Sequence, residues 1–423
     1  MLFVAIVLGL ALLIVGVPIF VFFALTGSTI LLFHLNVTSY VIGQSMFTAV
    51  TKYMLVSLPL YILLGQLMLH GGLAKRLTNM SVAWVGHYRG GLAIASIMAI
   101  AFFSAISGSI LASIITIGAI MIPIMVQNGY SKPFAGAVIA SAAGIDALIP
   151  PSSAAIVYAS ITGTSLSKLF MAGLIPGIIQ GVLLLVVAAF LSRKIPTIKP
   201  VPWRERLTAT YKALPVLSLV VIILGGIYIG VLLPTEAAAV ACLLALLLGF
   251  VVYRETTPRN VWQSLTETAK TTCVVFIMIA TASFLSQVFI YTQVPQNLAS
   301  AVAGVGLNPV TFMFMAMVAV LILGTFLEAV PNQLVSMPIF MVIAANLKVD
   351  LVAFYVPFCI FIGIGLLTPP VAVGAYTASS VARESPERIF RHIYPWFFLA
   401  MLASGALNIL IPQIALWIPN TMR

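Results

Sequence analysis

Four apolar stretches in this chain, each long enough to cross a membrane, are interrupted by residues that oppose a helix in lipid. The clearest is AGIDALIPPSSAAIVY at 143–158, where a proline pair, a serine pair and Asp146 stand in an otherwise apolar segment. An unpaired backbone N–H or C=O group in hydrocarbon is very costly, so such breaks persist only inside protein or beside a wet cavity. The chain is therefore limited to folds that bury these breaks at membrane depth.

The apolar content of the whole chain supports lipid as its main solvent. Of the 423 residues, 62% are hydrophobic and 7% are charged, which excludes an ordinary soluble domain. A spanning helix needs about 20 mostly apolar residues, and about eleven such passes recur along the chain. We expect an all-α polytopic membrane protein.

The formal net charge of +11 comes from basic residues in short loops between the apolar segments. This distribution matches the excess of Lys and Arg on the cytoplasmic side of membrane proteins and does not indicate nucleic-acid binding. The densest basic run, 192–212, is placed in the cytoplasm. Alternating the remaining loops puts 16 of the 20 Lys and Arg residues inside and both termini outside. The four outside are Lys52, Lys168, Lys348 and Arg423.

A basic cytoplasmic connector, 192–213, divides the chain into two halves with the same order of segments. In the first half, 1–191, we expect scaffold spans at 1–71, an arm helix at 72–84, a re-entrant hairpin at 90–127, a broken helix at 133–160 and a span at 170–191. In the second half, 214–423, we expect scaffold spans at 214–292, an arm helix at 295–305, a hairpin at 309–346, a broken helix at 350–380 and a span at 396–418.

The spacing of prolines supports a repeat. Pro150 precedes Pro176 by 26 residues, and Pro369 precedes Pro395 by 26 residues. An odd number of crossings separates the halves, so they face opposite ways in the bilayer. Inverted repeats with paired broken helices are typical of secondary transporters.

Each break exposes unpaired carbonyls at one half-helix and unpaired amides at the next. Carbonyl ends suit a hard cation such as Na⁺, and amide ends suit an anion. SAISGSI at 104–110 has the composition of a re-entrant turn, with a tight helix–helix contact as the alternative. Pro150 and Pro151 free carbonyls one turn back, near Asp146, and serines follow that can cap the next half-helix; a simple proline kink is the alternative.

Asp146 and Glu328 are the two carboxylates that we place deep in the membrane. Acids at that depth default to functional hypotheses. Three roles are open to each of them: a cation ligand, a proton carrier, or a cap on a broken helix end. The chain contains no phosphate-binding glycine loop, zinc spacing or nucleophile elbow, so we expect no enzyme and no catalytic residues.

Several stretches resemble the signatures of one family, the DctM-like large membrane subunit of TRAP transporters. The resemblance runs along essentially the whole chain, in SAISGSI, GYSKPFAGAVIASAAGIDALIPPSSAAIVYA, LFMAGLIPG, LLPTEAAAVA and GIGLLTPPV. It implies a tripartite secondary importer of organic acids in a bacterial or archaeal inner membrane, with an elevator-type transport domain moving against a scaffold. It also implies Na⁺ as coupling ion, no organic cofactor, a small four-span membrane subunit on a separate chain, and a periplasmic substrate-binding protein.

The resemblance also carries over site residues. One Na⁺ site is framed by the first hairpin tip and first break: Ser104, Ser107, Gly108, Asp146, Ile149 and Pro150. The other is framed by Gly324, Thr325, Glu328, Gly365, Thr368 and Pro369. The substrate lies between them, near Ser107, Ser109, Ser152, Ser153, Asn332 and Pro370. The sequence departs from the family pattern at Asp146 and Ala372, where glycine is usual.

Two other functions remain open from the sequence. One is a stand-alone anion symporter, coupled to Na⁺ or H⁺, that needs no partner protein. The other is a passive channel or a scaffold subunit that transports nothing. The residues do not specify which carboxylate is carried.

Overall fold

The computed structural model describes residues 17–33, 35, 38–297, 300 and 307–422, and these form helices without a strand. The start of the first expected span and most of the expected arm helix 295–305 lie outside the described residues. The helices of the first half are α2 (Ile19–Phe33), α3 (Tyr40–Val50), η1 (Tyr53–Val56), α4 (Ser57–His70), α5 (Leu73–Val85), α6 (Gly91–Ser107), α7 (Ile110–Gln127), α8 (Lys132–Ala143), η2 (Gly144–Ala147), α9 (Ser153–Thr162) and α10 (Leu166–Leu191).

The second half has a corresponding series. Its helices are α11 (Trp203–Tyr228), α12 (Pro234–Leu247), η3 (Leu248–Val252), α13 (Pro258–Tyr291), α15 (Pro309–Gly324), α16 (Ala329–Asn346), α17 (Leu351–Gly365), α18 (Val373–Ala382), α19 (Pro386–Ile393), α20 (Trp396–Leu410) and α21 (Gln413–Thr421).

Two of the expected segments are subdivided in the structure. The connector 192–213 is irregular only as far as Pro202, because α11 begins at Trp203 with Glu205 in its first turn, where an acid suits the helix dipole. The closing span 396–418 is divided into α20 and α21, and Pro412, which has no N–H to donate, stands at the division.

Among the described residues, seven helices are long and apolar enough to cross a membrane, and the bent pair α19–α20 makes an eighth. Five further apolar helices have only 10–17 residues: α2, α6, α9, α15 and α17. Four of these five belong to the expected hairpins and broken helices. They are short because the predicted interruptions end them.

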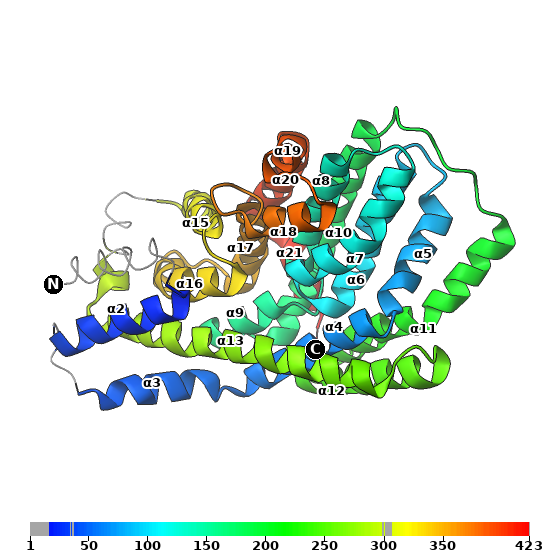
Figure 1. The fold of residues 1–423 in the computed structure, drawn as a ribbon. Helices are drawn as coiled ribbons and strands as arrows, with labels where there is room; N and C mark the ends of the chain where they lie inside the picture. The colour runs from blue at the N-terminus through cyan, green and yellow to red at the C-terminus, as the bar shows by residue number, and fades with distance from the viewer. Residues whose placement is uncertain (1–16, 34, 36–37, 298–299, 301–306, 423) are drawn as a thin grey trace.

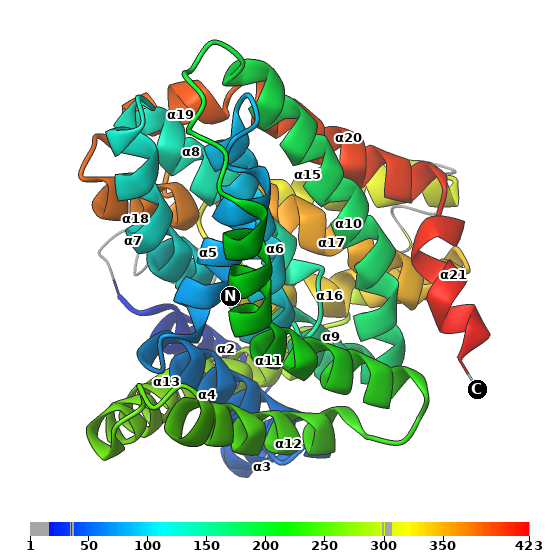
Figure 2. The same ribbon diagram turned by 90° about the vertical axis from the view of Figure 1, so that its right-hand side faces the viewer.

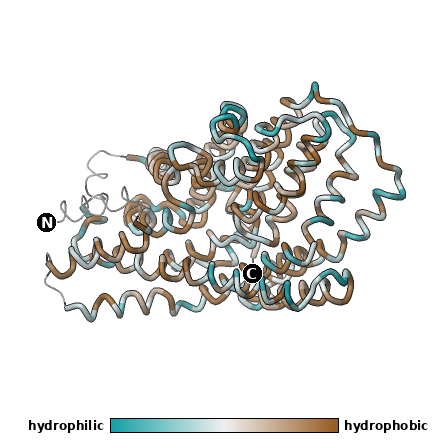
Figure 3. Tube along the Cα trace, in the orientation of Figure 1, coloured by the Kyte–Doolittle hydropathy of each residue, from teal (hydrophilic) through white to brown (hydrophobic). Residues whose placement is uncertain are grey.

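The helices form two groups that lie against each other (Figures 1 and 2). On one side α13 packs on α2, α3 and α4, and α12 packs on α4 and α11. The other side holds α6–α10 and α15–α21, including both hairpins and both broken helices. α5 packs on α6 and on α11, so it joins the two groups. Hydrophobic residues dominate the trace within both groups, and hydrophilic ones mark the loop between α10 and α11 (Figure 3).

The start of α5 is held to the loop between α12 and α13 by charge. Arg76 donates two hydrogen bonds to the Glu255 carboxylate, at 3.1 and 2.9 Å, and its guanidinium lies 3.7 Å from the centre of the Tyr253 ring. The hydrogen bonds from Arg76 hold the pKa of Glu255 below its usual value. At the other end of α5, the Trp84 indole donates to the Thr210 hydroxyl of α11 at 2.7 Å. Both ends of α5 are therefore fixed to the α11–α13 side.

Candidate functional site

The first hairpin tip lies directly on the first break. α6 ends at Ser107 and is followed by Gly108, whose φ of +59° suits glycine. Ser109 then caps the start of α7 by accepting a hydrogen bond from Ala112 N. The Gly108 carbonyl accepts hydrogen bonds from Ser153 N at 3.3 Å and from Ser153 Oγ at 2.9 Å. A Cβ at Gly108 would lie 2.4 Å from the Pro151 carbonyl oxygen. The hairpin tip and the residues just after the proline pair therefore form one unit.

The second hairpin tip has the same relation to the second break. The Thr325 carbonyl accepts hydrogen bonds from Val371 N and Ala372 N, each at 3.2 Å. Beside them α15 and α17 approach at two glycines, and a Cβ at Gly365 would lie 2.7 Å from Gly324 Cα. In both halves, therefore, a carbonyl at the hairpin tip accepts hydrogen bonds from backbone amides that follow a proline pair. Without this carbonyl those amides would have no hydrogen-bond partner.

The two breaks correspond residue by residue. Residues 144–151 align without a gap on residues 363–370, with glycine and isoleucine at the start of each segment and a cis Pro–Pro bond at the end. A Cβ at Gly363 would lie 3.5 Å from Gly144 Cα, so the two aligned glycines face each other. The breaks therefore meet at equivalent positions in the two halves.

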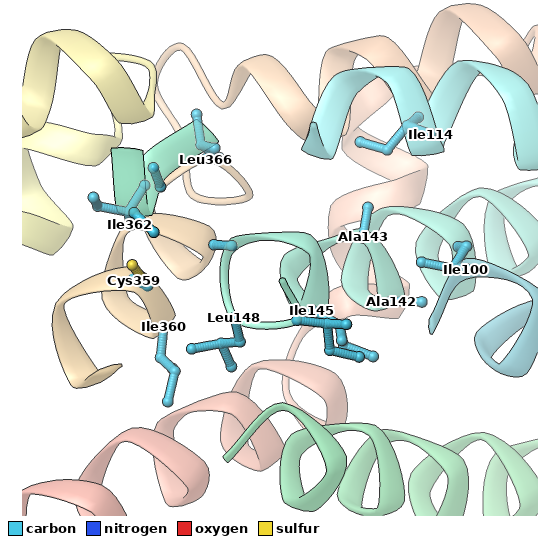
Figure 4. Packing of buried hydrophobic residues seen from close by; sticks show 14 of the residues in the cluster. Ile100, Ile114, Ala142, Ala143, Ile145, Leu148, Cys359, Ile360, Ile362 and Leu366 are labelled. Carbon is cyan, nitrogen blue, oxygen red and sulfur yellow. The ribbon is translucent and has the colours of Figure 1, made fainter. Parts of the chain in front are cut away.

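Other groups of the two broken helices join at the same place. The Ala147 carbonyl accepts hydrogen bonds from Ser152 Oγ at 3.1 Å and from the Tyr355 hydroxyl of α17 at 3.0 Å. Figure 4 shows Ile145 and Leu148 of the first break near residues of α17, with Ile100 and Ile114 of the first hairpin close by. The surroundings are closely packed apolar side chains.

The predicted residues of the first cation site come together as a buried cluster. The Ser104 hydroxyl donates to the Ile100 carbonyl at 2.7 Å, and the hydroxyls of Ser107 and Ser113 lie 3.3 Å apart. Asp146 is fully buried, with Ser104 and Ser113 beside its carboxylate. Neither carboxylate oxygen accepts a hydrogen bond from any described residue. Asp146 is therefore not a helix cap in this structure.

The residues predicted for the second cation site differ in exposure, and two of them, Gly324 and Gly365, are in contact. Thr325, Gly324 and Gly365 are buried, whereas Pro369 and Glu328 are exposed. Glu328 stands at the N-cap position of α16, but its carboxylate accepts no hydrogen bond from the first turn of that helix. The capping role considered for Glu328 is thus not formed.

Thr368 connects the second break to the chain after α19. Its hydroxyl donates to the Ile364 carbonyl at 2.8 Å and accepts from the Tyr394 hydroxyl at 3.0 Å. Tyr394 carries no signal in the sequence beyond its position beside Pro395.

Several residues predicted to bind substrate have side chains that form hydrogen bonds to nearby backbone groups. Asn332 is fully buried and its amide donates to the Val320 carbonyl at 2.9 Å, which joins α16 to α15. Ser109 accepts a hydrogen bond from Ala112 N, whereas Ser152 stands at the N-cap of α9 without capping it and donates to the Ala147 carbonyl. Pro370 is exposed and lies at a pocket. Within this group, the Asn332 side chain is buried between the two helices of the second hairpin.

Sequence reasoning missed this open pocket of about 840 Å³ beside the second break. It lies between α7 and α18, and its lining residues are Ile115, Pro370, Val371, Val373, Tyr376, Thr377, Ser380 and Val381. Gln180 on α10 was also missed; it is fully buried beside Gly144, and its amide has no hydrogen-bond partner in the described chain. A lone glutamine in a long apolar span was the available signal for it.

Comparisons with known proteins agree with this architecture. A family model described as "Tripartite ATP-independent periplasmic transporter, DctM component" matches residues 6–414. The chain is similar to the C4-dicarboxylate TRAP transporter large permease protein DctM of Vibrio cholerae, with 33% identity over 98% of this chain and 97% of the relative. It is also similar to the protein of the same name from Pseudomonas aeruginosa, with 38% identity over 89% of this chain and 88% of the relative.

Other matching relatives are named for isethionate, ectoine and sialic acid. Among solved structures, the Alcanivorax borkumensis YdaH transporter superposes with a TM-score of 0.66 at 12% identity, over 90% of this chain and 88% of that one. At that identity the likeness concerns the fold alone, which is that of a membrane transporter.

Proposed function

Because the chain belongs to the DctM family of tripartite ATP-independent periplasmic transporters, we propose that it is the large permease subunit of a Na⁺-coupled importer of an organic acid. In this proposal it lies in the inner membrane of a bacterium or archaeon, with both termini outside. It works with a small four-span membrane subunit and with a periplasmic protein that delivers the substrate.

The observation that carries the proposal is the contact between hairpin tip and break, which occurs once in each half. Gly108 O binds the backbone after Pro151, Thr325 O binds the backbone after Pro370, and the two breaks meet at Gly144 and Gly363. A channel lining needs no such paired, closed units. A carrier that holds ions and substrate at mid-depth between inverted repeats needs one such unit in each half.

The polar groups at these contacts suit the proposed ligands. Hydroxyl and carbonyl oxygens of the first tip and first break would coordinate one Na⁺, and those around Thr325 and Thr368 would coordinate a second. Beside the second break, the pocket contains Thr377 and Ser380 and adjoins the first turn of α18, whose amides favour an anion. We place the substrate carboxylate there.

The grouping of helices suggests which parts move. The hairpins and broken helices contact one another extensively and would travel as one body, whereas α2–α4 and α11–α13 would remain fixed. α5 contacts both groups and is fastened to the fixed side by Arg76 and Trp84. It would act as the arm between them.

Uptake into liposomes tests the proposal. With the permease, its small subunit and the binding protein present, an inward Na⁺ gradient should accumulate a radiolabelled C4-dicarboxylate above its external concentration. Replacing Na⁺ by choline outside should abolish accumulation, because the coupling gradient is then absent. Liposomes that lack only the permease serve as the control.

Two outcomes would contradict the proposal. Equal uptake without the binding protein would indicate a stand-alone symporter. Uptake that never exceeds the external concentration in any gradient would indicate a passive channel.

Hydroxyl deletions at the two proposed cation sites should weaken Na⁺ dependence. In Ser107→Ala and Thr368→Ala we expect the Na⁺ concentration for half-maximal uptake to rise about tenfold, the effect of losing one ligand worth about 1.4 kcal/mol. Ser218→Ala is the matched control, because within the described part of the chain its hydroxyl bonds only to the Pro215 carbonyl of α11. Unchanged Na⁺ dependence in both site variants would refute these ligand assignments.

A further inference from the structure

The two halves differ in one buried residue at their most similar place. In the alignment of residues 144–151 on 363–370, Asp146 stands opposite Gly365. Gly365 touches the backbone of Gly324, so the second half has no room for a side chain there. The first half has a carboxylate at the equivalent position, and the pseudo-symmetric pair is therefore electrostatically unequal.

Asp146 has no counter-charge of its own. Among the described residues it is the only Asp, Glu, Lys or Arg in the buried set, and the ion pairs found there join other residues: Arg76 to Glu255, Lys270 to Glu267 and Arg388 to Glu384. Burying an ionised carboxylate without a partner is strongly unfavourable. At this position the carboxylate is stable only when it is protonated or paired with a cation, and no described side chain supplies that cation.

The neighbours of Asp146 present hydroxyl oxygens to its carboxylate. A hydroxyl has a single proton to donate, and the Ser104 proton is directed at the Ile100 carbonyl. Ser107 and Ser113 share one hydrogen bond with each other, which uses the proton of one of them. A cluster that contains a free carboxylate and hydroxyl oxygens facing it has the ligands that a hard cation prefers.

We propose that Asp146 gives the first cation site a fixed negative charge that the second site lacks, so that the bound Na⁺ is the counter-ion of a buried carboxylate. This inference rests on the Na⁺ coupling proposed above. It makes the first site the tighter of the two, and it makes the folded protein without Na⁺ carry an uncompensated buried charge. Stability and Na⁺ occupancy are then linked through this one residue.

Thermal unfolding of the purified permease in detergent tests this at constant ionic strength, with NaCl replacing choline chloride stepwise. Wild type should be stabilised by Na⁺. In Asp146→Asn, the Na⁺ concentration that gives half of the stabilisation should rise about tenfold or more, the loss expected for a charged ligand worth at least about 1.5 kcal/mol. In choline alone, Asp146→Asn should unfold at a higher temperature than wild type, because no charge is buried.

Asp146→Gly, which copies the second half, should show the same loss of Na⁺ response and guards against a misfit specific to asparagine. Asp350→Asn is the matched control: Asp350 caps α17 through Val352 N and Ala353 N, and asparagine caps equally well. It should keep the wild-type Na⁺ response.

Three outcomes would overturn the inference in distinguishable ways. If both Asp146 variants respond to Na⁺ as wild type does, the proposed role of the Asp146 charge is refuted and the Na⁺ coupling proposal stands. If wild type does not respond to Na⁺, both the role of the Asp146 charge and the Na⁺ coupling are refuted. Stabilisation of wild type in choline by lowering the pH, with no added effect of Na⁺, would show that a proton is the counter-ion.

Discussion

Gly108→Ala is expected to abolish Na⁺-driven uptake, whereas Gly163→Ala should transport nearly as wild type does. Both glycines follow a helix with positive φ, +59° at Gly108 and +72° at Gly163, so alanine costs each about 1–2 kcal/mol of backbone strain. Only at Gly108 does the new Cβ collide with backbone, 2.4 Å from Pro151 O. At Gly163 no described heavy atom lies within 4 Å of it.

Comparing the two variants separates the effect of the contact between Gly108 and Pro151 from the strain of placing alanine at positive φ. Uptake in the reconstituted three-component system gives the activity, and thermal unfolding of each variant shows whether it is folded. We expect Gly108→Ala to remain folded, because its helices stay packed elsewhere, and to lose the closed unit of tip and break. Equal uptake by the two variants would show that this unit is not needed for transport.

The positions of the breaks were predictable from sequence because their causes are local. A proline pair cannot continue a helix, and a Ser–Gly pair favours a left-handed turn, so the ends of η2, α6 and α17 follow from Pro150, Gly108 and Pro369. The repeat was also visible, because these local signals recur in the same order. Such features depend on residues within one turn of one another.

The partners of the freed backbone groups were not predictable. That Thr325 O binds the amides of Val371 and Ala372, or that Gly144 faces Gly363, depends on how segments far apart in the sequence pack. Asn332 illustrates the limit: an amide beside a break suggests a ligand, but in the fold it satisfies the Val320 carbonyl inside its own hairpin. The pocket between α7 and α18 was missed for the same reason.

Asp146, which departs from the pattern of the family and of the second half, indicates function and not fold. Asp146 is unusual both against the family pattern and against its equivalent in the second half, Gly365. The sequence showed the substitution, but only the fold shows that the carboxylate is fully buried and has no hydrogen-bond partner among the residues that the structure describes. A buried carboxylate is normally paired or hydrogen-bonded, and Asp146 is neither among the described residues. Positions that break such a rule are expected to be functional.

Gly365→Ala is expected to produce the largest loss of stability, together with loss of Na⁺ dependence. The added Cβ would lie 2.7 Å from Gly324 Cα and 2.8 Å from Leu321 O, so two backbones must separate. Overpacking of this kind typically costs about 1–3 kcal/mol, and here no flexible side chain can yield. Close helix contacts in membranes depend on such small residues.

Gly225→Ala is the matched control for that substitution. Gly225 also lies in a helix, α11, but no described atom is within 4 Å of an added Cβ. Alanine there should be neutral or stabilise by about 0.5–1 kcal/mol, because glycine is the poorer helix former. If Gly365→Ala unfolds at the same temperature as Gly225→Ala and keeps its Na⁺ dependence, α15 and α17 can separate without harm. The second tip and break would then not form a rigid site, and the equivalence of the two halves would be limited to their chain path.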